Sequence, residues 1–249
     1  MRNFNKIPQV EPLGDFCYAG DMRKTTFANG EFYHIYNRGV DKREVFLAEA
    51  DYERFLICLR EFNRIEAIGS LYEKSFKKVE HLGTKSPLGD LVPKCEPLVE
   101  IVAYCLNPNH FHLILKQISE KGISKFMLKV STGHTTYFNK KYKRSGSLFQ
   151  GPFKAIQIDS NDYLLYLSAY VNRNYFIHNL GTKSPSEISQ GEWKYCSALD
   201  YLGKRNGNLC NKSAILDQFR SVNDYEIFLN DNAVYLKEKK ELEKYLLEE

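Results

Sequence analysis

The strongest constraint on the fold is a pair of apolar segments, residues 99–106 and 110–116, joined by Asn107-Pro108-Asn109. A short connection containing Pro and Asn is typical of a tight turn, and the residues on both sides favour strands. Two strands joined this closely pair in antiparallel fashion. The chain is therefore expected to contain a β-hairpin, and with it an antiparallel sheet.

The second strand of this hairpin begins with the triplet His110-Phe111-His112. Residues two apart on a strand point to the same face, so the two imidazoles would lie side by side. Such a pair can bind a metal ion, although a His-x-His pair on a strand more often has a structural role. A metal ion also needs at least a third ligand, which another part of the chain has to supply.

The other segments give the order of the expected elements. A strand is expected at 31–38 from its aromatic and β-branched residues. Helices are expected at 51–67 and 121–143 from the spacing of their apolar residues. A short strand at 153–158 precedes a helix that runs from 160 to about 177. The order strand, helix, two strands, helix, strand, helix predicts an α+β fold, in which helices cover an antiparallel sheet.

The length of 249 residues suits one large domain or one domain with extensions. Residues 1–29 contain Pro and Gly without a sustained period, and we expect a loose N-terminal arm. Residues 30–180 would form the catalytic domain, with a polar inserted loop at 69–97. Residues 181–249 would form a C-terminal extension that is mostly helical, and its last stretch, 223–249, is expected to be a peripheral charged helix.

The cellular environment is indicated by what the sequence contains. The six cysteines form no CxxC pair and are expected to be reduced thiols. The N-terminus lacks the apolar stretch of a signal peptide, and no apolar run approaches the roughly eighteen residues of a membrane span. We therefore expect a cytoplasmic protein with no membrane partner.

The charges are unevenly distributed. Between residues 121 and 157 there are eight Lys or Arg residues and no Asp or Glu, whereas residues 223–249 contain eight acidic residues against four Lys. A one-sign segment inside a mixed chain predicts a surface for a polyanion, with nucleic acid as the first candidate. The alternative is an ordinary solvated helix face.

The helix expected from residue 160 to about 177 carries Tyr163, Tyr166, Tyr170 and Asn174 at spacings of three and four residues, so they share one face. If this helix crosses the hairpin, Asn174 can offer an amide oxygen to a metal ion held by the histidine pair. Two imidazoles and one amide oxygen with open positions suit Mg²⁺ or Mn²⁺ in phosphate chemistry.

The sequence also resembles a known family. His110-Phe111-His112 is similar to the HUH motif (histidine, bulky hydrophobic residue, histidine) of single-tyrosine transposases that act on single-stranded DNA. The resemblance covers roughly residues 30–202. Its other segments are Tyr33–Gly39 for the first strand, Gly146–Phe153 before the last strand, Asp162–Asn174 for the catalytic helix and Trp193–Ala198 for a segment of the REP-associated branch.

This resemblance implies a ferredoxin-like antiparallel sheet with helices on one face, followed by a C-terminal helical extension. It implies that His110, His112 and Asn174 bind Mg²⁺ or Mn²⁺. It further implies that Tyr170 is the nucleophile, which becomes linked to a 5′ phosphate while a 3′ hydroxyl is released. The family usually has Pro after the Asn, whereas this chain has Tyr175, so we expect a longer helix. The insertion at 69–97 also departs from the family pattern.

The resemblance also suggests that the basic segment binds DNA. Basic side chains can contact phosphates, and aromatic rings can stack on unpaired bases. Tyr137, Phe138, Tyr142 and Phe149 are candidates for stacking, although core packing is the better interpretation for Phe138 and Phe149. The residues predicted to contact DNA are Arg38, Lys140, Lys141, Tyr142, Lys143, Arg144, Lys154 and Arg173.

A short repeat suggests a trace of the DNA substrate in the gene itself. Gly83-Thr84-Lys85-Ser86-Pro87 recurs at residues 181–185. The reverse complement of codons for the first copy, shifted by one base, can encode Gly-Asp-Leu-Val-Pro, which is the sequence at 89–93. We hypothesise that residues 83–93 are encoded by an inverted repeat able to form a DNA hairpin. Coincidence between two low-complexity loops is the alternative.

These observations predict a metal-dependent, single-stranded DNA endonuclease and strand transferase of the REP-associated type, acting on single-stranded or hairpin DNA as a monomer or homodimer. Two alternatives belong to other classes. One is a nucleic-acid-binding module with an inactive site. The other is a metal-dependent phosphoesterase that uses water and does not need Tyr170.

Overall fold

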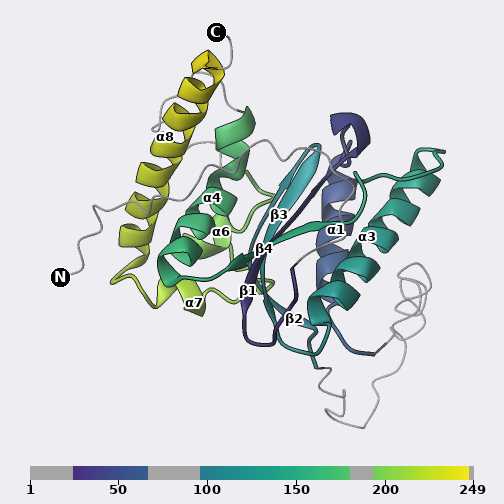
Figure 1. The fold of residues 1–249 in the computed structure, drawn as a ribbon, viewed down its shortest axis with the longest axis horizontal. Helices are drawn as coiled ribbons and strands as arrows, with labels where there is room; N and C mark the ends of the chain where they lie inside the picture. Colours follow the sequence, from purple (N-terminus) through teal and green to yellow (C-terminus); the bar gives the residue numbers. More distant parts are fainter. Residues whose placement is uncertain (1–24, 67–95, 180–192, 247–249) are drawn as a thin grey trace.

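The computed structural model describes residues 25–66, 96–179 and 193–246 of the chain. These residues form an antiparallel sheet of four strands with the order β2-β3-β1-β4 (Figure 1). The strands are β1 (Phe32–Arg38), β2 (Val99–Asn107), β3 (His110–Gln117) and β4 (Lys154–Ile158). The α+β class and the ferredoxin-like order of the strands are therefore confirmed.

The predicted hairpin consists of β2 and β3, and Asn107 pairs with His110 beside the turn. The carbonyl of Pro108, in the turn, accepts hydrogen bonds from the backbone N–H groups of Val45 (2.8 Å) and Phe46 (3.1 Å). These two bonds attach the turn to the segment that follows β1. The beginning of β3, where the histidine pair lies, is thus held both by its pairing with β2 and by the attachment of the turn.

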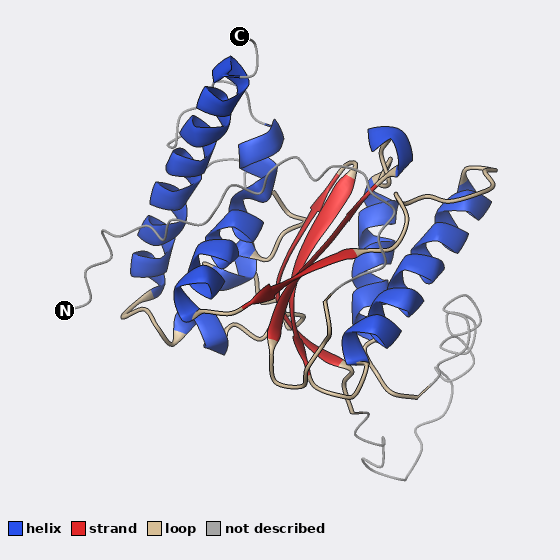
Figure 2. Ribbon diagram, viewed as in Figure 1, coloured by secondary structure: helices blue, strands red, loops and turns tan. Residues whose placement is uncertain are grey.

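The long helices of the described residues lie in two layers, one on each face of the sheet (Figure 2). Helices α1 (Glu49–Glu61) and α3 (Gly122–Lys141) cover one face, and α4 (Asn161–Asn179) covers the other with α8 (Val222–Leu246) outside it. Three short helical segments complete the described residues, namely η1 (Val40–Lys42), α6 (Ala198–Tyr201) and α7 (Ser213–Leu216).

The expectation that the helices lie on one face of the sheet is wrong, because α1 and α3 cover one face and α4 covers the other. The central strand β3 is apolar on both sides, as Leu113 and Ile114 are adjacent on it and both fully buried. Strands of this kind need cover on both faces. Leu113 packs with α1 and α3, whereas Ile114 packs with α4.

The prediction of a peripheral C-terminal helix is also wrong. Tyr225 and Leu229 of α8 are fully buried in the core that contains α4. The hydroxyl of Tyr225 donates to Ser168 Oγ (3.3 Å) and accepts a hydrogen bond from the amide of Asn172 (2.9 Å), both on α4. Helix α8 is therefore part of the layer that holds α4 against the sheet.

The observed bounds differ from the expected ones by a few residues at most helix ends. Helix α4 continues through Tyr175 to Asn179, as the absence of Pro at that position predicted. Residues 25–28 of the expected arm lie against the sheet, where Thr25 Oγ1 donates to the carbonyl of Ala155 (3.0 Å). The possible inverted repeat at 83–93, most of the insertion at 69–97 and the second repeat copy at 181–185 lie outside the described residues.

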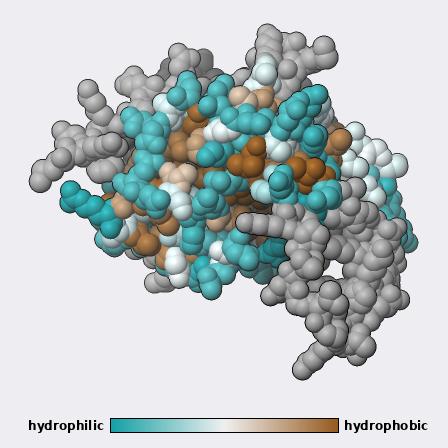
Figure 3. All heavy atoms as spheres, turned by 90° about the horizontal axis from the view of Figure 1, so that it is seen from below, coloured by the Kyte–Doolittle hydropathy of each residue, from teal (hydrophilic) through white to brown (hydrophobic). Residues whose placement is uncertain are grey.

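None of the described helices is long and apolar enough to cross a membrane. Hydrophobic residues on the face shown in Figure 3 form small patches between hydrophilic ones. Large exposed apolar side chains are few among the described residues, with Leu128 on α3 the most exposed at 68%.

Candidate active site

The two histidines of the triplet lie on β3 and face α4. Their ring centroids are 5.1 Å apart, with the ring planes nearly perpendicular at 87°. His112 is buried and His110 is half-buried. The intervening Phe111 is fully buried on the opposite face, in the core with α1 and α3. The alternation of the strand therefore places both imidazoles on one side, as the sequence predicted.

The position of the proton on His110 follows from its neighbour. His110 Nδ1 lies 2.6 Å from the amide oxygen of Asn109, whose amide nitrogen donates to the carbonyl of Lys42 (3.2 Å). Because an amide oxygen can only accept, His110 Nδ1 must donate. The lone pair of this imidazole is therefore on Nε2, which is the nitrogen directed toward α4.

Asn174 of α4 meets this nitrogen. Its Oδ1 lies 3.1 Å from His110 Nε2, and both atoms are acceptors. Both also contact the amide nitrogen of Asn107, at 2.8 Å from Asn174 Oδ1 and 3.1 Å from His110 Nε2. Asn174 is fully buried, and its Nδ2 has no hydrogen-bond partner among the described residues.

This donor set fits the metal ion that the sequence resemblance implies. Amide oxygen is an ordinary ligand of Mg²⁺ and Mn²⁺, whereas imidazole nitrogen is a softer ligand that suits transition metals better than Mg²⁺. The facing acceptors of His110 and Asn174 would both be satisfied by one cation. Within residues 25–66, 96–179 and 193–246, no group of three or more His, Cys, Asp or Glu side chains is placed to share a metal ion. The amide of Asn174 is therefore needed to complete a set of three.

Tyr170 lies one turn of α4 before Asn174. Its ring meets that of His112 edge-on, with 5.5 Å between the centroids and 84° between the planes. Burial raises the pKa of Tyr170 to about 12, and the neighbouring amide of Asn174 acts in the opposite direction. The phenol therefore keeps its proton at neutral pH, and a cation or base is required before it can act as a nucleophile.

The position of α4 depends on polar contacts that the sequence did not reveal. The amide oxygen of Asn172 accepts a hydrogen bond from Ser197 Oγ (2.6 Å), and this Oγ accepts one from the backbone N–H of Tyr104 on β2 (2.9 Å). Tyr175 stacks on Trp193, with 3.9 Å between the ring centroids and 2° between the planes. These contacts fix Tyr170 and Asn174 relative to the hairpin.

Four site residues were missed by sequence reasoning. Asn107 and Asn109 flank the predicted turn, where they were interpreted as turn formers. His34 and Tyr36 lie on β1, which pairs with β3, and their rings stack with that of His112. Their alternation with buried apolar residues was a possible signal, but the sequence did not show which strand would be the neighbour of β3.

The predicted DNA contacts on α3 divide into two groups. Lys140 and Lys143 are exposed at the end of the helix. Lys141 Nζ forms an ion pair with Asp51 Oδ1 (2.6 Å), and the hydroxyl of Tyr142 donates to Asp51 Oδ2 (2.8 Å). Although burial acts in the opposite direction, the hydrogen bonds from Lys141 and Tyr142 hold the pKa of Asp51 below its usual value. Lys141 and Tyr142 thus attach α3 to α1.

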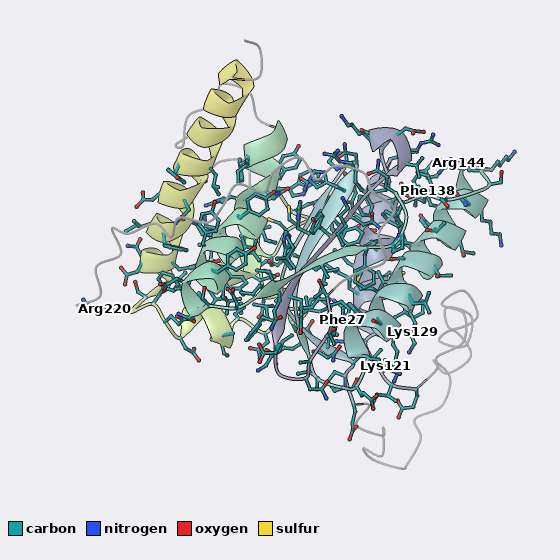
Figure 4. The ribbon with its side chains drawn as sticks, in the orientation of Figure 1. Phe27, Lys121, Lys129, Phe138, Arg144 and Arg220 are labelled. Carbon is teal, nitrogen blue, oxygen red and sulfur yellow. The ribbon has the colours of Figure 1, made fainter. Side chains whose placement is uncertain are left out.

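The basic residues described on α3 and just after it are spread over both ends of the helix. Arg144 lies over the ring of Phe138 at the end of α3, with 5.6 Å from its guanidinium carbon to the ring centroid, whereas Lys121 and Lys129 lie toward the other end (Figure 4). Phe138 and Phe149 are buried, as core packing predicted. Helix α3 covers the face of the sheet opposite to the histidine pair. The sheet therefore lies between this helix and the candidate site.

The remaining predicted contacts lie on the sheet and on α4. Arg38 and Lys154 are exposed, and Arg38 pairs with His110 across the β1–β3 ladder. Arg173 is 3% exposed, donates to Asn230 of α8 (2.8 Å) and lies over the ring of Phe176. Its prediction as a DNA contact is withdrawn, because the packing of α8 on α4 removes the guanidinium from solvent.

Comparison with known proteins gives a match to one family model and a similarity to a solved structure. Residues 94–174 match the model of a family described as transposase, IS200-like, and this range includes the histidine pair, Tyr170 and Asn174. The resemblance to this kind of transposase is thereby confirmed. No curated protein matches the chain. Among solved structures, a REP-associated tyrosine transposase bound to a REP hairpin is similar with a TM-score of 0.46 and 14% identity, covering 78% of this chain and 96% of that one.

Proposed function

We propose that this chain, in which residues 94–174 match the IS200-like transposases, is a metal-dependent single-stranded DNA endonuclease and strand transferase. One observation carries the proposal. The elements β3 and α4, some sixty residues apart in sequence, bring together two imidazoles, an amide oxygen and the Tyr170 phenol in a half-buried site. A divalent cation held beside a phenol in this way is suited to phosphoryl transfer.

In this proposal His110, His112 and Asn174 hold Mg²⁺ or Mn²⁺, and the bound ion supplies positive charge that polarises a phosphoryl oxygen and favours the phenolate form of Tyr170. His110 contributes Nε2, because its Nδ1 proton is donated to Asn109. Asn174 contributes Oδ1 from a fully buried side chain, whose position is fixed by α4.

The chemical step balances without an energy source. Tyr170 Oη attacks the phosphorus of a DNA strand, a Tyr–O–P bond forms and the bond from phosphorus to the 3′ oxygen breaks. The phenol proton is transferred, directly or through solvent, to the departing 3′ oxygen, which becomes a hydroxyl. The reverse step, with the 3′ hydroxyl of a second strand as attacking group, joins the strands. The phosphotyrosine conserves the bond energy, so ATP is not needed.

The DNA strand would contact basic side chains near the site and others at the end of α3. Arg38 lies on β1, which pairs with β3, and Lys154 lies on β4, which pairs with β1. Lys140, Lys143 and Arg144 extend the basic surface at the end of α3. Contacts of this type bind phosphates and position a strand without reading its sequence. A hairpin or REP-like substrate is proposed from the sequence segments similar to the REP-associated branch. The oligomeric state, monomer or homodimer, and a cytoplasmic location remain predictions.

The test is a cleavage assay with single-stranded hairpin oligonucleotides and Mn²⁺ or Mg²⁺, followed on denaturing gels. The wild-type protein is expected to form a covalent protein–DNA adduct that Tyr170→Phe does not form. Tyr163→Phe is the matched control, because Tyr163 lies on the same helix and is half-buried. The control is expected to form the adduct at the wild-type level.

Other outcomes identify the alternatives. Cleavage that survives Tyr170→Phe without an adduct would indicate a phosphoesterase that uses water. Binding of the oligonucleotide without cleavage by the wild-type protein would indicate a nucleic-acid-binding module, which the raised pKa of Tyr170 would then explain. An adduct that persists in Tyr170→Phe but not in Tyr163→Phe or Tyr166→Phe would assign the nucleophile to another tyrosine of the helix face.

A further inference from the structure

A buried histidine on the neighbouring strand contacts one member of the histidine pair. His34 of β1 is 1% exposed, and its Nε2 lies 2.8 Å from Nδ1 of His112. The two rings are nearly parallel, with 17° between their planes and 5.1 Å between their centroids. His34 also faces the nucleophile, since its ring meets that of Tyr170 edge-on at 6.3 Å.

This contact resembles the one made by the other histidine of the pair. His110 donates its Nδ1 proton to Asn109, and the partner of Nδ1 in His112 is His34. Both imidazoles are thus held through Nδ1, and Nε2 is the other nitrogen of each ring. Metal-binding histidines usually have such a partner on the nitrogen that does not bind the metal, since the partner fixes both the ring orientation and the tautomer.

One proton lies between the two nitrogens, and its position decides what His112 can bind. If His34 donates, the neutral His112 ring carries its own proton on Nε2, which then cannot bind a cation. If His112 donates, its Nε2 has the lone pair and His34 Nε2 is the acceptor. Binding of a cation through His112 Nε2 therefore requires His34 to accept.

We propose that His34 is a positioning residue for the metal site, which accepts the Nδ1 proton of His112 and thereby directs His112 Nε2 toward the cation. The inference rests on the proposed function, because it concerns the ion that His110, His112 and Asn174 would hold. His34 acts through His112 and is not itself a ligand in this proposal. Its own Nδ1 has no hydrogen-bond partner among the described residues, so the bond to His112 is the polar contact that the structure shows for this ring.

The first test measures Mn²⁺ binding to the full chain without DNA, from the electron paramagnetic resonance signal of free Mn²⁺. His34→Phe keeps a ring of similar size but cannot accept a hydrogen bond, and is expected to weaken Mn²⁺ binding by roughly 10- to 100-fold. His34→Gln, whose amide oxygen can accept the same proton, is expected to retain more of the affinity than His34→Phe. Thermal denaturation of each variant reports whether the fold is intact.

His134→Phe is the matched control, because His134 is a second fully buried histidine, on α3 and on the other face of the sheet. It is expected to bind Mn²⁺ as the wild-type protein does. Wild-type affinity in His34→Phe would overturn the inference, and so would equal losses in His34→Phe and His34→Gln. A wild-type protein that binds no Mn²⁺ would instead contradict the proposed function, so the two failures are distinguishable.

A second measurement needs no variant of His34. In protein labelled with ¹⁵N at histidine and saturated with Mg²⁺, long-range ¹H–¹⁵N spectra show which ring nitrogen of His112 carries a proton, and His112→Gln identifies its signals. A proton on Nδ1 of His112 is the expected result. A proton on Nε2 in the Mg²⁺-saturated protein would overturn the inference.

Discussion

At the scale of the residue, His34 and His134 are buried and uncharged. Burial lowers the pKa of His34 to about 3 and that of His134 to about 4, from 6.5. For His134, the hydrogen bond from Nε2 to the carbonyl of Val45 and the charge of Asp51 raise the pKa but do not cancel the effect of burial. Protonation of either ring therefore lowers the free energy of unfolding.

The first prediction concerns stability in acid. Below pH 6.5 the unfolded chain binds a proton at His134 and the folded chain does not, so the free energy of unfolding falls as the pH falls toward 4. For this one residue the loss is up to about 3 kcal/mol, and it is absent above pH 6.5. Urea denaturation at pH 4.5 to 7.5 measures it.

His134→Gln is the comparison for this measurement, since its side chain can still donate to Val45 and does not titrate. Its unfolding free energy is expected to depend less on pH in this window than that of the wild-type protein. His34 titrates in both proteins, and the difference between the two curves isolates His134. Parallel curves would contradict the prediction. Arg54 and Lys141, which disfavour the charged ring, are unchanged in both.

At the scale of the element, the end of α3 shows that adjacent lysines have different roles. Lys140 is exposed, whereas Lys141 pairs with the fully buried carboxylate of Asp51 on α1. This carboxylate also accepts hydrogen bonds from the backbone N–H groups of Leu47 and Ala48 at the beginning of α1. The ion pair thus connects the beginning of one helix to the end of the other.

The second prediction separates these roles. Lys140→Ala is expected to weaken binding of single-stranded DNA and to reduce its salt dependence, with unfolding free energy changed by about 0.5 kcal/mol or less. Lys141→Ala is expected to lower the unfolding free energy by about 1–3 kcal/mol, because the buried Asp51 loses a partner. Fluorescence anisotropy at several salt concentrations and urea denaturation measure the two effects. Equal effects on stability would show that the ion pair with Asp51 contributes little.

At the scale of the whole molecule, the candidate site is assembled within one chain. Helix α4 is enclosed between the sheet and α8, and Tyr225 of α8 bonds to Asn172 on α4. Tyr170 therefore lies beside the histidine pair of its own chain. An arrangement in which α4 moves to a second copy would break these buried contacts.

The third prediction follows from this assembly. A mixture of Tyr170→Phe and His112→Ala proteins is expected to remain without cleavage activity on hairpin DNA, because neither chain has a complete site. The control is a mixture of each variant with wild-type protein, which is expected to cleave in proportion to the wild type present. Cleavage by the mixed variants would show that two chains share a site.

The sequence by itself determined the features that depend on local periodicity. Alternation along residues 110–116 places His110 and His112 on one face, and helical spacing places Tyr170 and Asn174 one turn apart. Backbone geometry alone imposes both relations, so they hold in any fold that contains these elements. The two apolar strands and their short turn likewise required a hairpin.

Only the tertiary structure decided which elements are neighbours. The order β2-β3-β1-β4 brings His34 to within a hydrogen bond of His112, although 78 residues separate them. The packing of α8 on α4 buries Arg173, which the sequence suggested as a DNA contact, and folding turns Lys141 toward Asp51. These outcomes depend on contacts between distant segments, where burial and charge pairing are set by the whole core and not by the residues on either side in the sequence.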